Sequence, residues 1–413
     1  MLEKMKKLQS AIDALIPKME SIYKDLHKNP ELSMQEFRTS HIVAEHLKKL
    51  NFEVTENIGI TGVIGLLKNG EGNTVMLRAD MDALPMEEKT GLEYASNKMG
   101  ETLDGVKTPV SHMCGHDLHV SWLMGVSEIL ALNRALWQGT LMLVFQPGEE
   151  IGKGALAMIE DMKNDFPKPD IILGQHVMPG KAGTVGYRSG AILTAGDSLH
   201  VRFKGKGGHG SMPQNAIDPV MIAACSAVRL QTIVSREINP LDSAVLTIGS
   251  IQAGTKENII PDEAVLKINM RSFDDAVRSK MLQSMKRICC CESQASGAPE
   301  PDIEFIDSYP VTENDKEATE KLSVHFIGYF GERSYFTDPA TASEDFSQFG
   351  RKWKTPYVFW LIGGTNGELW DKAIKSGHPE SIPVNHSSGF KIELDPTLRT
   401  GTEAMLVAAL TWL

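Results

Sequence analysis

The sequence has no long hydrophobic run, and its N-terminus lacks the uninterrupted apolar core of a signal peptide. No stretch approaches the roughly 18 apolar residues that a membrane-spanning helix needs. Cysteine is scarce as well: the five residues are an odd number and three are consecutive, Cys289, Cys290 and Cys291, which argues against a disulfide framework. We assign this triplet no role. These absences predict a soluble protein of a reducing compartment, the cytoplasm.

Positive charge is also in deficit. The chain of 413 residues has 42 Lys and Arg against 53 Asp and Glu, a formal net charge of −11. Polyphosphate repels such a chain, so nucleic acid and anionic membrane surfaces are poor partners. A small-molecule substrate or a basic partner fits better. With 42% hydrophobic and 23% charged residues, we expect a folded protein of one large or two modest domains.

Apolar patterning at the two ends of the chain predicts an α/β fold with a mixed, mostly parallel sheet flanked by helices. There is no internal repeat or low-complexity run. We expect two N-terminal helices, the second around 23–26 and ended by Pro30, followed by helices over 40–50, 119–132 and 318–330, strands over 63–67, 74–78, 139–145 and 357–362, and a closing helix from Pro396.

The pattern of apolar and polar residues along the sequence changes around Gly183. Strands over 198–206, 243–254, 264–272 and 302–309, with helices over 218–235 and 274–293, follow the β-α-β-β-α-β order of a ferredoxin-like unit. We therefore divide the chain into a discontinuous catalytic domain, residues 1–186 and 309–413, and an inserted lid and dimerisation domain, residues 187–308.

The densest cluster of metal-binding residue types lies in Ser111–His119, whose last eight residues include three His, one Cys and one Asp. Taken alone, a Cys is commonly a small buried hydrophobe and a single His is more often a packed or surface residue than a ligand. Cys114 and His116 are separated by one glycine, whose backbone freedom lets both side chains reach the same or adjacent metal ions. Together these residues predict a metal site.

Further donors lie at the ends of apolar segments. Glu149 and Glu150 follow a predicted strand, where one carboxylate can ligate a cation while its neighbour faces water as a general base. His176 ends another apolar run, and His386 is a further candidate near the C-terminus. The dispersed donors are typical of an enzyme metal site, since clustered CxxC zinc motifs are absent. Five ligands, Cys114, His116, Glu150, His176 and His386, suit two metals bridged by a thiolate and a water.

Five segments, residues 77–85, 113–119, 146–150, 207–213 and 385–386, resemble a known family. It is the dinuclear metallo-amidohydrolase/peptidase family, in its aminoacylase and hippurate hydrolase branch. That branch includes bacterial N-acyl-amino-acid amidohydrolases and plant auxin-conjugate hydrolases. The resemblance runs in order from about His27 to Leu413 and covers nearly the whole chain.

The resemblance implies that the five donors named above are the metal ligands and that Glu149 is the general base. The exopeptidase branches bridge their ions with an Asp, whereas this chain offers the Cys-Gly-His turn. Arg78 stands where those relatives keep a metal-binding His, so Asp80 and Asp82 are expected to orient His ligands from behind. Two more acidic residues are expected to support the site in the same way, Asp117 and Glu344.

The expected lid contributes substrate contacts through the same resemblance. His209 matches a histidine that holds the scissile carbonyl or the carboxylate of the substrate, often from the partner subunit, and so implies a homodimer or a dimer-based tetramer. Asn258 and Arg271 match residues that contact the amino-acid part of the substrate, and an Arg fork suits a free α-carboxylate. An exposed Arg in a surface ion pair is the alternative reading for Arg271.

These residues predict a metal-dependent amidohydrolase that cleaves the amide bond of N-acyl amino acids with a metal-bound water activated by Glu149. Dipeptide hydrolysis, or deacetylation of a biosynthetic intermediate by the same site, is the alternative, and an inactive binding or scaffold protein is a third reading. Two divalent ions per subunit are expected, and residue types leave zinc, manganese, cobalt and nickel open.

Overall fold

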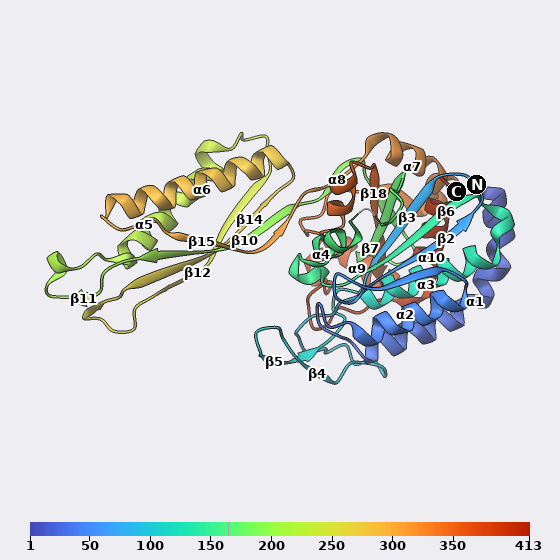
Figure 1. Cartoon of the computed structure of the whole chain (residues 1–413), viewed down its shortest axis with the longest axis horizontal. Helices are drawn as coiled ribbons and strands as arrows, with labels where there is room; N and C mark the ends of the chain where they lie inside the picture. The colour runs from blue at the N-terminus through green and yellow to red at the C-terminus, as the bar shows by residue number, and fades with distance from the viewer. Residues whose placement is uncertain (164) are drawn as a thin grey trace. The chain divides into compact units, whose positions relative to one another are not determined.

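The computed structural model describes residues 1–163 and 165–413, which form two compact units (Figure 1). Unit 1 combines Met1–Gly190, Glu313–Asp338 and Asp345–Leu413, and unit 2 combines Ala191–Thr312 and Pro339–Glu344. Pro339–Glu344 thus lies outside the range 187–308 expected for an inserted domain. That unit 1 is a catalytic domain and unit 2 a lid stays a prediction.

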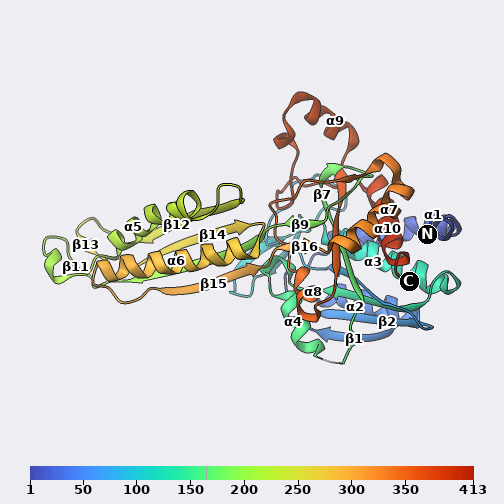
Figure 2. The ribbon, with the colours of Figure 1, turned by 90° about the horizontal axis from the view of Figure 1, so that it is seen from above.

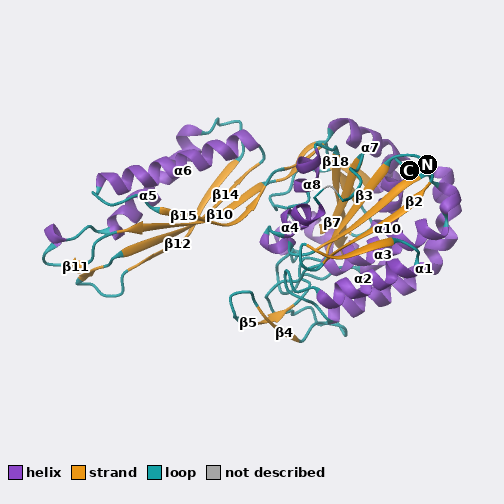
Figure 3. Cartoon of the chain, viewed as in Figure 1, coloured by secondary structure: helices purple, strands orange, loops and turns teal. Residues whose placement is uncertain are grey.

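Unit 1 is built on an eight-stranded sheet, whose strands appear in orange in Figure 3. Its four central strands, β6, β3, β7 and β18, run parallel, and four of the seven neighbouring pairs are parallel. The mixed, mostly parallel sheet predicted from the sequence is therefore confirmed. In spatial order the strands are β1 (Glu53–Ile58), β2 (Gly62–Asn69), β6 (Gly139–Gln146), β3 (Thr74–Asp80), β7 (Ile171–Lys181), β18 (Tyr357–Thr365), β8 (Val185–Tyr187) and β17 (Ser334–Phe336).

Helices flank this sheet because its central strands are apolar on both faces. Leu141 and Leu143 of β6 join the main core, while Met142 and Val144, which alternate with them, are also buried and point to the opposite face. Helix α3 packs against α1 and α10, and α4 packs against α8. The helices of unit 1 are α1 (Leu2–Lys28), α2 (Phe37–Lys49), α3 (His116–Leu132), α4 (Gly154–Met162), α7 (Lys316–Phe330), α8 (Ser347–Trp353), α9 (Gly367–Ser376) and α10 (Leu394–Leu410).

The N-terminal prediction of two helices is wrong, because α1 is one helix of 27 residues with Pro17 inside it. Its buried residues continue at helical spacing on both sides of the proline: Met5, Leu8, Ile12, Leu15, Met19, Tyr23 and Leu26. Packing of this continuous apolar stripe against the core outweighs the local cost of the proline. Among the described residues, no helix is both long and apolar enough to cross a bilayer.

Unit 2 is a four-stranded antiparallel sheet in the order β12-β14-β10-β15, with two helices. Helices α5 and α6 pack on each other and on β10 and β14 (Figure 2), which gives the ferredoxin-like arrangement predicted from the sequence. Asp218 and Asp274 cap the two helices through their carboxylates. The elements are β10 (Ala195–Lys204), α5 (Pro219–Thr232), β12 (Ala244–Ala253), β14 (Glu263–Ser272), α6 (Asp275–Ala295) and β15 (Asp302–Tyr309).

Short elements complete the two units. In unit 1 a hairpin precedes α3, and in unit 2 a two-stranded ladder carries His209. The short strands are β4 (Lys98–Glu101), β5 (Lys107–Val110), β9 (Gly190–Leu193), β11 (Gly208–His209), β13 (Ile259–Ile260) and β16 (Thr312–Asn314). The turn after β6 includes a 3-10 helix, η2 (Glu149–Ile151).

Candidate metal centre

The carboxyl ends of the parallel strands of unit 1 deliver the predicted donors to one edge of the sheet. Asp80 is the last residue of β3, Glu149 and Glu150 follow β6 in η2, and His176 lies within β7. In open α/β sheets this edge is where ligands bind. Sequence segments that are far apart are therefore brought together by the sheet itself.

A tight turn presents Cys114 and His116 at the start of α3. Gly115 between them has φ +87, in the left-handed region that suits glycine, and forms the N-cap of the helix. A Cβ at this position would lie 2.4 Å from Val177 Cγ1 of β7. The turn thus seats closely on β7, and α3 begins at His116, three residues before the predicted start.

Cys114, Glu150 and His386 form one group of possible ligands. The Nε2 atom of His386 lies 3.3 Å from Cys114 Sγ and 3.2 Å from Glu150 Oε2. The backbone N–H of His386 donates to Met113 O, which attaches the C-terminal loop beside the Cys114 turn. His176 joins from β7, with its Nε2 atom 3.5 Å from Cys114 Sγ.

A second group consists of His116, Glu149 and Glu150. His116 Nε2 lies 3.7 Å from Glu150 Oε1 and 4.0 Å from Glu149 Oε2. Both His116 Nε2 and Glu150 Oε1 are buried and have no hydrogen-bond partner among the described residues. Buried polar atoms are rarely left in this state, and a bound metal ion would supply the missing partner. Because Glu150 belongs to both groups, the donors fit a dinuclear site.

The pKa shifts of the predicted ligands are consistent with a dinuclear metal site. Burial and the charge of Glu150 raise the pKa of the Cys114 thiol. The pKa of His386 rises to about 10 because its ring donates to Cys114 and Glu150. Burial lowers the pKa of His116, but Asp80 and Cys114 outweigh it and hold this pKa well above its usual range. Protons on histidines thus balance charge that divalent cations would balance when bound.

His176 is the neutral member of the cluster. Burial, together with the nearby His119, places its pKa well below the usual range. Its Nδ1 atom lies 2.7 Å from Val177 O and donates to it, which leaves the lone pair of Nε2 directed at the Cys114 side. This is the tautomer that a metal-binding imidazole requires.

Asp82 lies behind the site where the sequence predicted it. Its Oδ1 atom is 3.2 Å from His116 Nδ1, and its Oδ2 atom accepts the backbone N–H of Glu150 at 3.0 Å. One carboxylate thereby orients two predicted ligands, the first through its ring and the second through its backbone. Asp82 also accepts a hydrogen bond from Ser33 and is fully buried.

Asp80 faces a predicted ligand directly, because its Oδ2 atom lies 3.7 Å from His116 Nε2, and it also contacts residues that the sequence analysis did not assign. It accepts a hydrogen bond from Arg78 Nη1 at 2.7 Å and lies 2.5 Å from His119 Nδ1. His119 Nε2 in turn accepts the N–H of Val177 at 3.0 Å, so both ring nitrogens are occupied by protein. The position of His119, three residues after His116 on the same helix, was the available signal.

Asp117 was expected to orient histidine ligands, and this expectation is wrong. Its Oδ2 atom lies 2.6 Å from Nδ1 of His27, at the end of α1, and its Oδ1 atom accepts its own helix N–H at Leu118. Because α3 begins at His116, residue 117 points to the side of α1 rather than to the donors. Asp117 therefore connects two helices.

The other predicted residues belong to unit 2, and their roles stay predictions. His209 is exposed and pairs with Ser211, and Asn258 is exposed nearby on the adjoining short strand connection. Arg271 of β14 donates to Thr341 O and to Ser343 Oγ. Glu344 is buried at the end of the segment that returns to unit 1.

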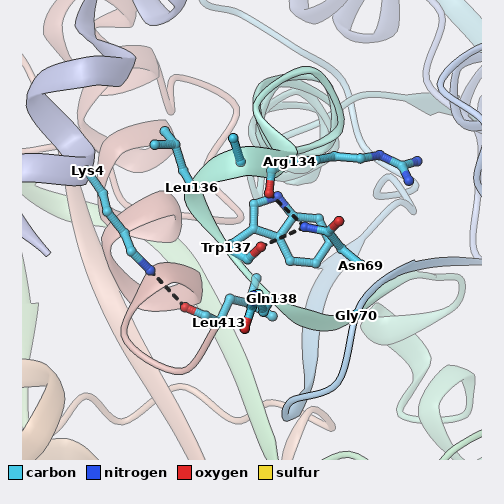
Figure 4. Close-up of a pocket in the computed structure, with 9 residues that line it drawn as sticks. Lys4, Asn69, Gly70, Arg134, Leu136, Trp137, Gln138 and Leu413 are labelled. Atoms are coloured by element: carbon cyan, nitrogen blue, oxygen red, sulfur yellow. Dashed lines mark hydrogen bonds between the residues drawn. The ribbon is translucent and has the colours of Figure 1, made fainter.

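A pocket of about 510 Å³ elsewhere in unit 1 contains none of the predicted site residues (Figure 4). Asn69 Nδ2 donates to the backbone oxygens of Arg134 and Trp137, and Lys4 Nζ donates to Leu413 O. The pocket is lined by residues near the two chain termini and by the segment before β6, so we assign it no catalytic role.

Comparison with known proteins identifies the family. The family model "Peptidase family M20/M25/M40" matches residues 76–386. Thermostable carboxypeptidase 2 of Saccharolobus solfataricus is 37% identical over 98% of both chains, and hippurate hydrolase of Campylobacter jejuni is 40% identical over 82% of this chain and 87% of the relative. A dinuclear metal-binding peptidase of the M20 family from Bacillus subtilis superimposes with a TM-score of 0.75 at 26% identity, covering 96% of this chain and 98% of that structure.

The chain therefore belongs to peptidase family M20/M25/M40. This membership makes it a hydrolase of a metallopeptidase family, and the two groups of donors in unit 1 fit a dinuclear metal site. The family resemblance predicted from the sequence motifs is confirmed.

Proposed function

We propose that the protein hydrolyses the amide bond of N-acyl amino acids and releases a carboxylic acid and a free amino acid. The observation that carries this proposal is the position of two adjacent carboxylates, which share one group of possible ligands with His116. Glu150 lies between His386 and His116, whereas Glu149 Oε2 stands 4.0 Å from His116 Nε2 on the side of the second group. We propose that Glu150 holds metal and that Glu149 moves a proton.

The ligands are proposed to be Cys114, His116, Glu150, His176 and His386. Divalent cations held by them supply Lewis acidity, which polarises an amide carbonyl and acidifies water. The two unpartnered buried atoms, His116 Nε2 and Glu150 Oε1, support this assignment. Thiolate and imidazole favour zinc, while manganese, cobalt and nickel also suit the donor set.

Glu149 acts as the base. Its carboxylate takes a proton from the attacking water as the new C–O bond forms, and it returns this proton to the amide nitrogen as the C–N bond breaks. His209 is proposed to donate a hydrogen bond to the carbonyl oxygen as negative charge develops there. Asn258 and Arg271 are proposed to hold the amino-acid part, with the guanidinium on the α-carboxylate.

Unit 2 is proposed to carry the dimer interface. Large apolar side chains are exposed on its surface, among them Leu241 at 93%, Val228 at 75% and Met221 at 57%. Exposed apolar surface of this kind is typical of contacts with another chain. The partner we propose is a second copy, in a homodimer or a dimer-based tetramer, and we place the protein in the reducing cytoplasm, where the Cys114 thiol persists.

A substrate panel tests the reaction. N-acetyl, N-benzoyl and long-chain N-acyl amino acids and unblocked dipeptides are each assayed with zinc, manganese, cobalt and nickel. We expect kcat/KM to be highest for one of the N-acyl classes. Higher values for dipeptides would favour the peptidase alternative, which the similarity to a carboxypeptidase supports.

A variant tests the base. Glu149→Gln is expected to keep its metals and lose several orders of magnitude in kcat, whereas Glu160→Gln, which changes an exposed carboxylate of α4, serves as the control and keeps kcat. Near-native turnover by metal-loaded Glu149→Gln would remove Glu149 from the proposed role. A protein that binds less than about one divalent ion per chain after reconstitution would support the scaffold reading instead.

A further inference from the structure

A buried carboxylate lies beneath the turn that carries Glu149. Glu36 is the N-cap residue of α2 and has no exposed surface. It lies outside both groups of metal donors, and neither the sequence motifs nor the proposed reaction assigns it a task. A fully buried carboxylate is costly unless its oxygens receive hydrogen bonds, so its partners show what it stabilises.

The partners of Glu36 come from three different segments. Its Oε1 atom accepts the backbone N–H of Gly148 at 2.8 Å and that of Met34 at 2.9 Å. Its Oε2 atom accepts the hydroxyl of Thr61, in the turn between β1 and β2. The carboxylate thus joins the start of α2, a neighbouring turn and the residue directly before Glu149.

The turn after β6 is held on both sides of Glu149. Glu36 binds the N–H of Gly148, and Asp82 binds the N–H of Glu150 at 3.0 Å. Gly148 has φ +56, and a Cβ there would lie 2.9 Å from the end of the Met34 side chain. The loop that carries Met34 and Glu36 therefore packs directly beneath this turn and fixes its backbone.

Burial of the Glu36 carboxylate is electrostatically unfavourable, as the pKa of this group shows. Burial and the negative charge of Asp82 raise the pKa of Glu36 to about 7, against the opposing effect of its hydrogen bonds to Thr61 and Gly148. The side chain of Glu36 makes no capping hydrogen bond to α2, so capping of this helix does not explain its buried position. In its buried position the Glu36 carboxylate can accept the backbone N–H of Gly148.

We propose that Glu36 is a positioning residue for the reaction: its carboxylate fixes the backbone at Gly148 and thereby the direction of the Glu149 side chain. Glu36 touches neither substrate nor metal. The inference rests on the proposed function, because it takes Glu149 as the base. A displacement of about 1 Å in a reacting group costs up to roughly a hundredfold in rate, so a modest loosening of this turn is measurable.

The chain offers a matched control in Glu31. This carboxylate caps α2, accepting the N–H groups of Arg38 and Thr39 at 2.8 Å and the Thr39 hydroxyl at 2.9 Å. Glu31 stabilises the start of α2 and Glu36 stabilises the loop directly before it, while only Glu36 in addition reaches Gly148. Variants at either position are therefore expected to lose stability around the start of α2. Only variants at Glu36 are expected to lose the positioning of Gly148.

The experiment compares Glu36→Ala, Glu36→Gln and Glu31→Ala at saturating metal, with metal content, melting temperature, kcat and KM measured for each. Glu36→Ala is expected to lower kcat by roughly 10- to 100-fold with KM within about twofold. Glu36→Gln keeps an oxygen that accepts the Gly148 and Met34 N–H groups, so its kcat returns to within about threefold of the parent. Glu31→Ala lowers the melting temperature and keeps kcat.

A parental kcat in folded Glu36→Ala, or an equal loss of kcat in Glu31→Ala, overturns the proposal. So does a failure of Glu36→Gln to recover activity. Should Glu36→Ala not fold, Glu36→Asp replaces it: this carboxylate is one methylene shorter, cannot span from Thr61 to Gly148, and is expected to lower kcat at least about fivefold. An active Glu149→Gln would refute the base itself, whereas an inactive Glu149→Gln with a parental Glu36→Asp would refute the positioning role alone.

Discussion

His27 and Asp117 share a buried 2.6 Å contact between the end of α1 and the first turn of α3, although 90 positions separate them in the sequence. The other ring nitrogen of His27 lies 3.1 Å from Glu88. The two carboxylates outweigh burial and raise the pKa of His27 to about 10. A charged histidine therefore ties α1 to the helix whose N-terminus carries the metal donors.

The first prediction concerns stability at alkaline pH. Because the folded pKa of His27 lies above its unfolded value, its contribution is complete below about pH 6.5 and declines as pH rises toward 10. Denaturant unfolding of the parent protein should show a falling free energy of unfolding between pH 7 and 10. His27→Gln should be less stable by about 3 kcal/mol at pH 7 and flatter over this range. An equal pH slope in both proteins would contradict the assignment.

Glu150 belongs to both donor groups, so its removal should empty both. Glu150→Gln is expected to reduce bound metal from about two ions per chain to less than one. Glu149→Gln, which changes the neighbouring carboxylate, should keep about two. Metal analysis after dialysis against metal-free buffer compares the two variants, and full retention in Glu150→Gln would exclude it as a shared ligand.

Asp82 and Asp117 should behave differently, since one touches predicted ligands and the other touches α1. Asp82→Asn is expected to weaken metal affinity by roughly 10- to 100-fold. Asp117→Asn should lower the melting temperature while metal affinity stays within about threefold. Competition with a chromogenic chelator measures both, and similar metal affinities for the two variants would contradict this division.

Gly115→Ala tests how closely the donor turn seats on β7. Its left-handed φ costs an alanine about 1 kcal/mol, and the contact with Val177 adds roughly 1–3 kcal/mol of overpacking. Gly91→Ala is the matched control, because Gly91 has φ +71 and no neighbour within 4 Å of the added Cβ. Unfolding free energies should separate the two variants, and only Gly115→Ala should lose metal affinity.

Subunit mixing tests the proposed role of His209 across a dimer. Glu149→Gln and His209→Ala are each expected to be inactive, and mixed dimers that pair one intact base with one intact histidine should recover up to about a quarter to a half of parental activity. Exchange is verified by mass spectrometry of differently tagged chains. Confirmed exchange without recovery would place both residues in the same subunit.

Much of this architecture is readable from local patterns, and the exceptions have physical causes. The strand and helix order of unit 2 follows from alternation and from capping residues such as Asp218 and Asp274, which act locally. The prediction of two N-terminal helices failed because α1 continues through Pro17, and the packing that holds it together is a tertiary effect. The start of α3 shifted because Gly115 adopts a left-handed conformation that no periodicity reveals.

In the site, residue type and resemblance indicated the donors and two supporting carboxylates, Asp80 and Asp82, whereas other supporting residues were not predicted. Cys114, Glu150 and His386 were named from chemistry and resemblance, and the fold brings them within 3.3 Å of one another in two pairs. His119 and Glu36 act through partners 39 and 112 positions away, and Arg78 reaches Asp345, 267 positions away, so their roles depend on the packed structure. Asp117 is the opposite case. It follows the predicted ligand His116 directly in the sequence, yet its side chain contacts His27.

The strand order of unit 1 has a consequence for the newly made chain. β18 lies between β7 and β8 in the sheet, yet it follows all of Ala191–Thr312 in the sequence. Until the ribosome has released residues 357–365, β7 remains an open edge able to pair with other chains, while nearly all of unit 2 is already complete. Translation arrest or truncation shortly before Tyr357 should therefore yield a folded unit 2 attached to an aggregation-prone partial sheet.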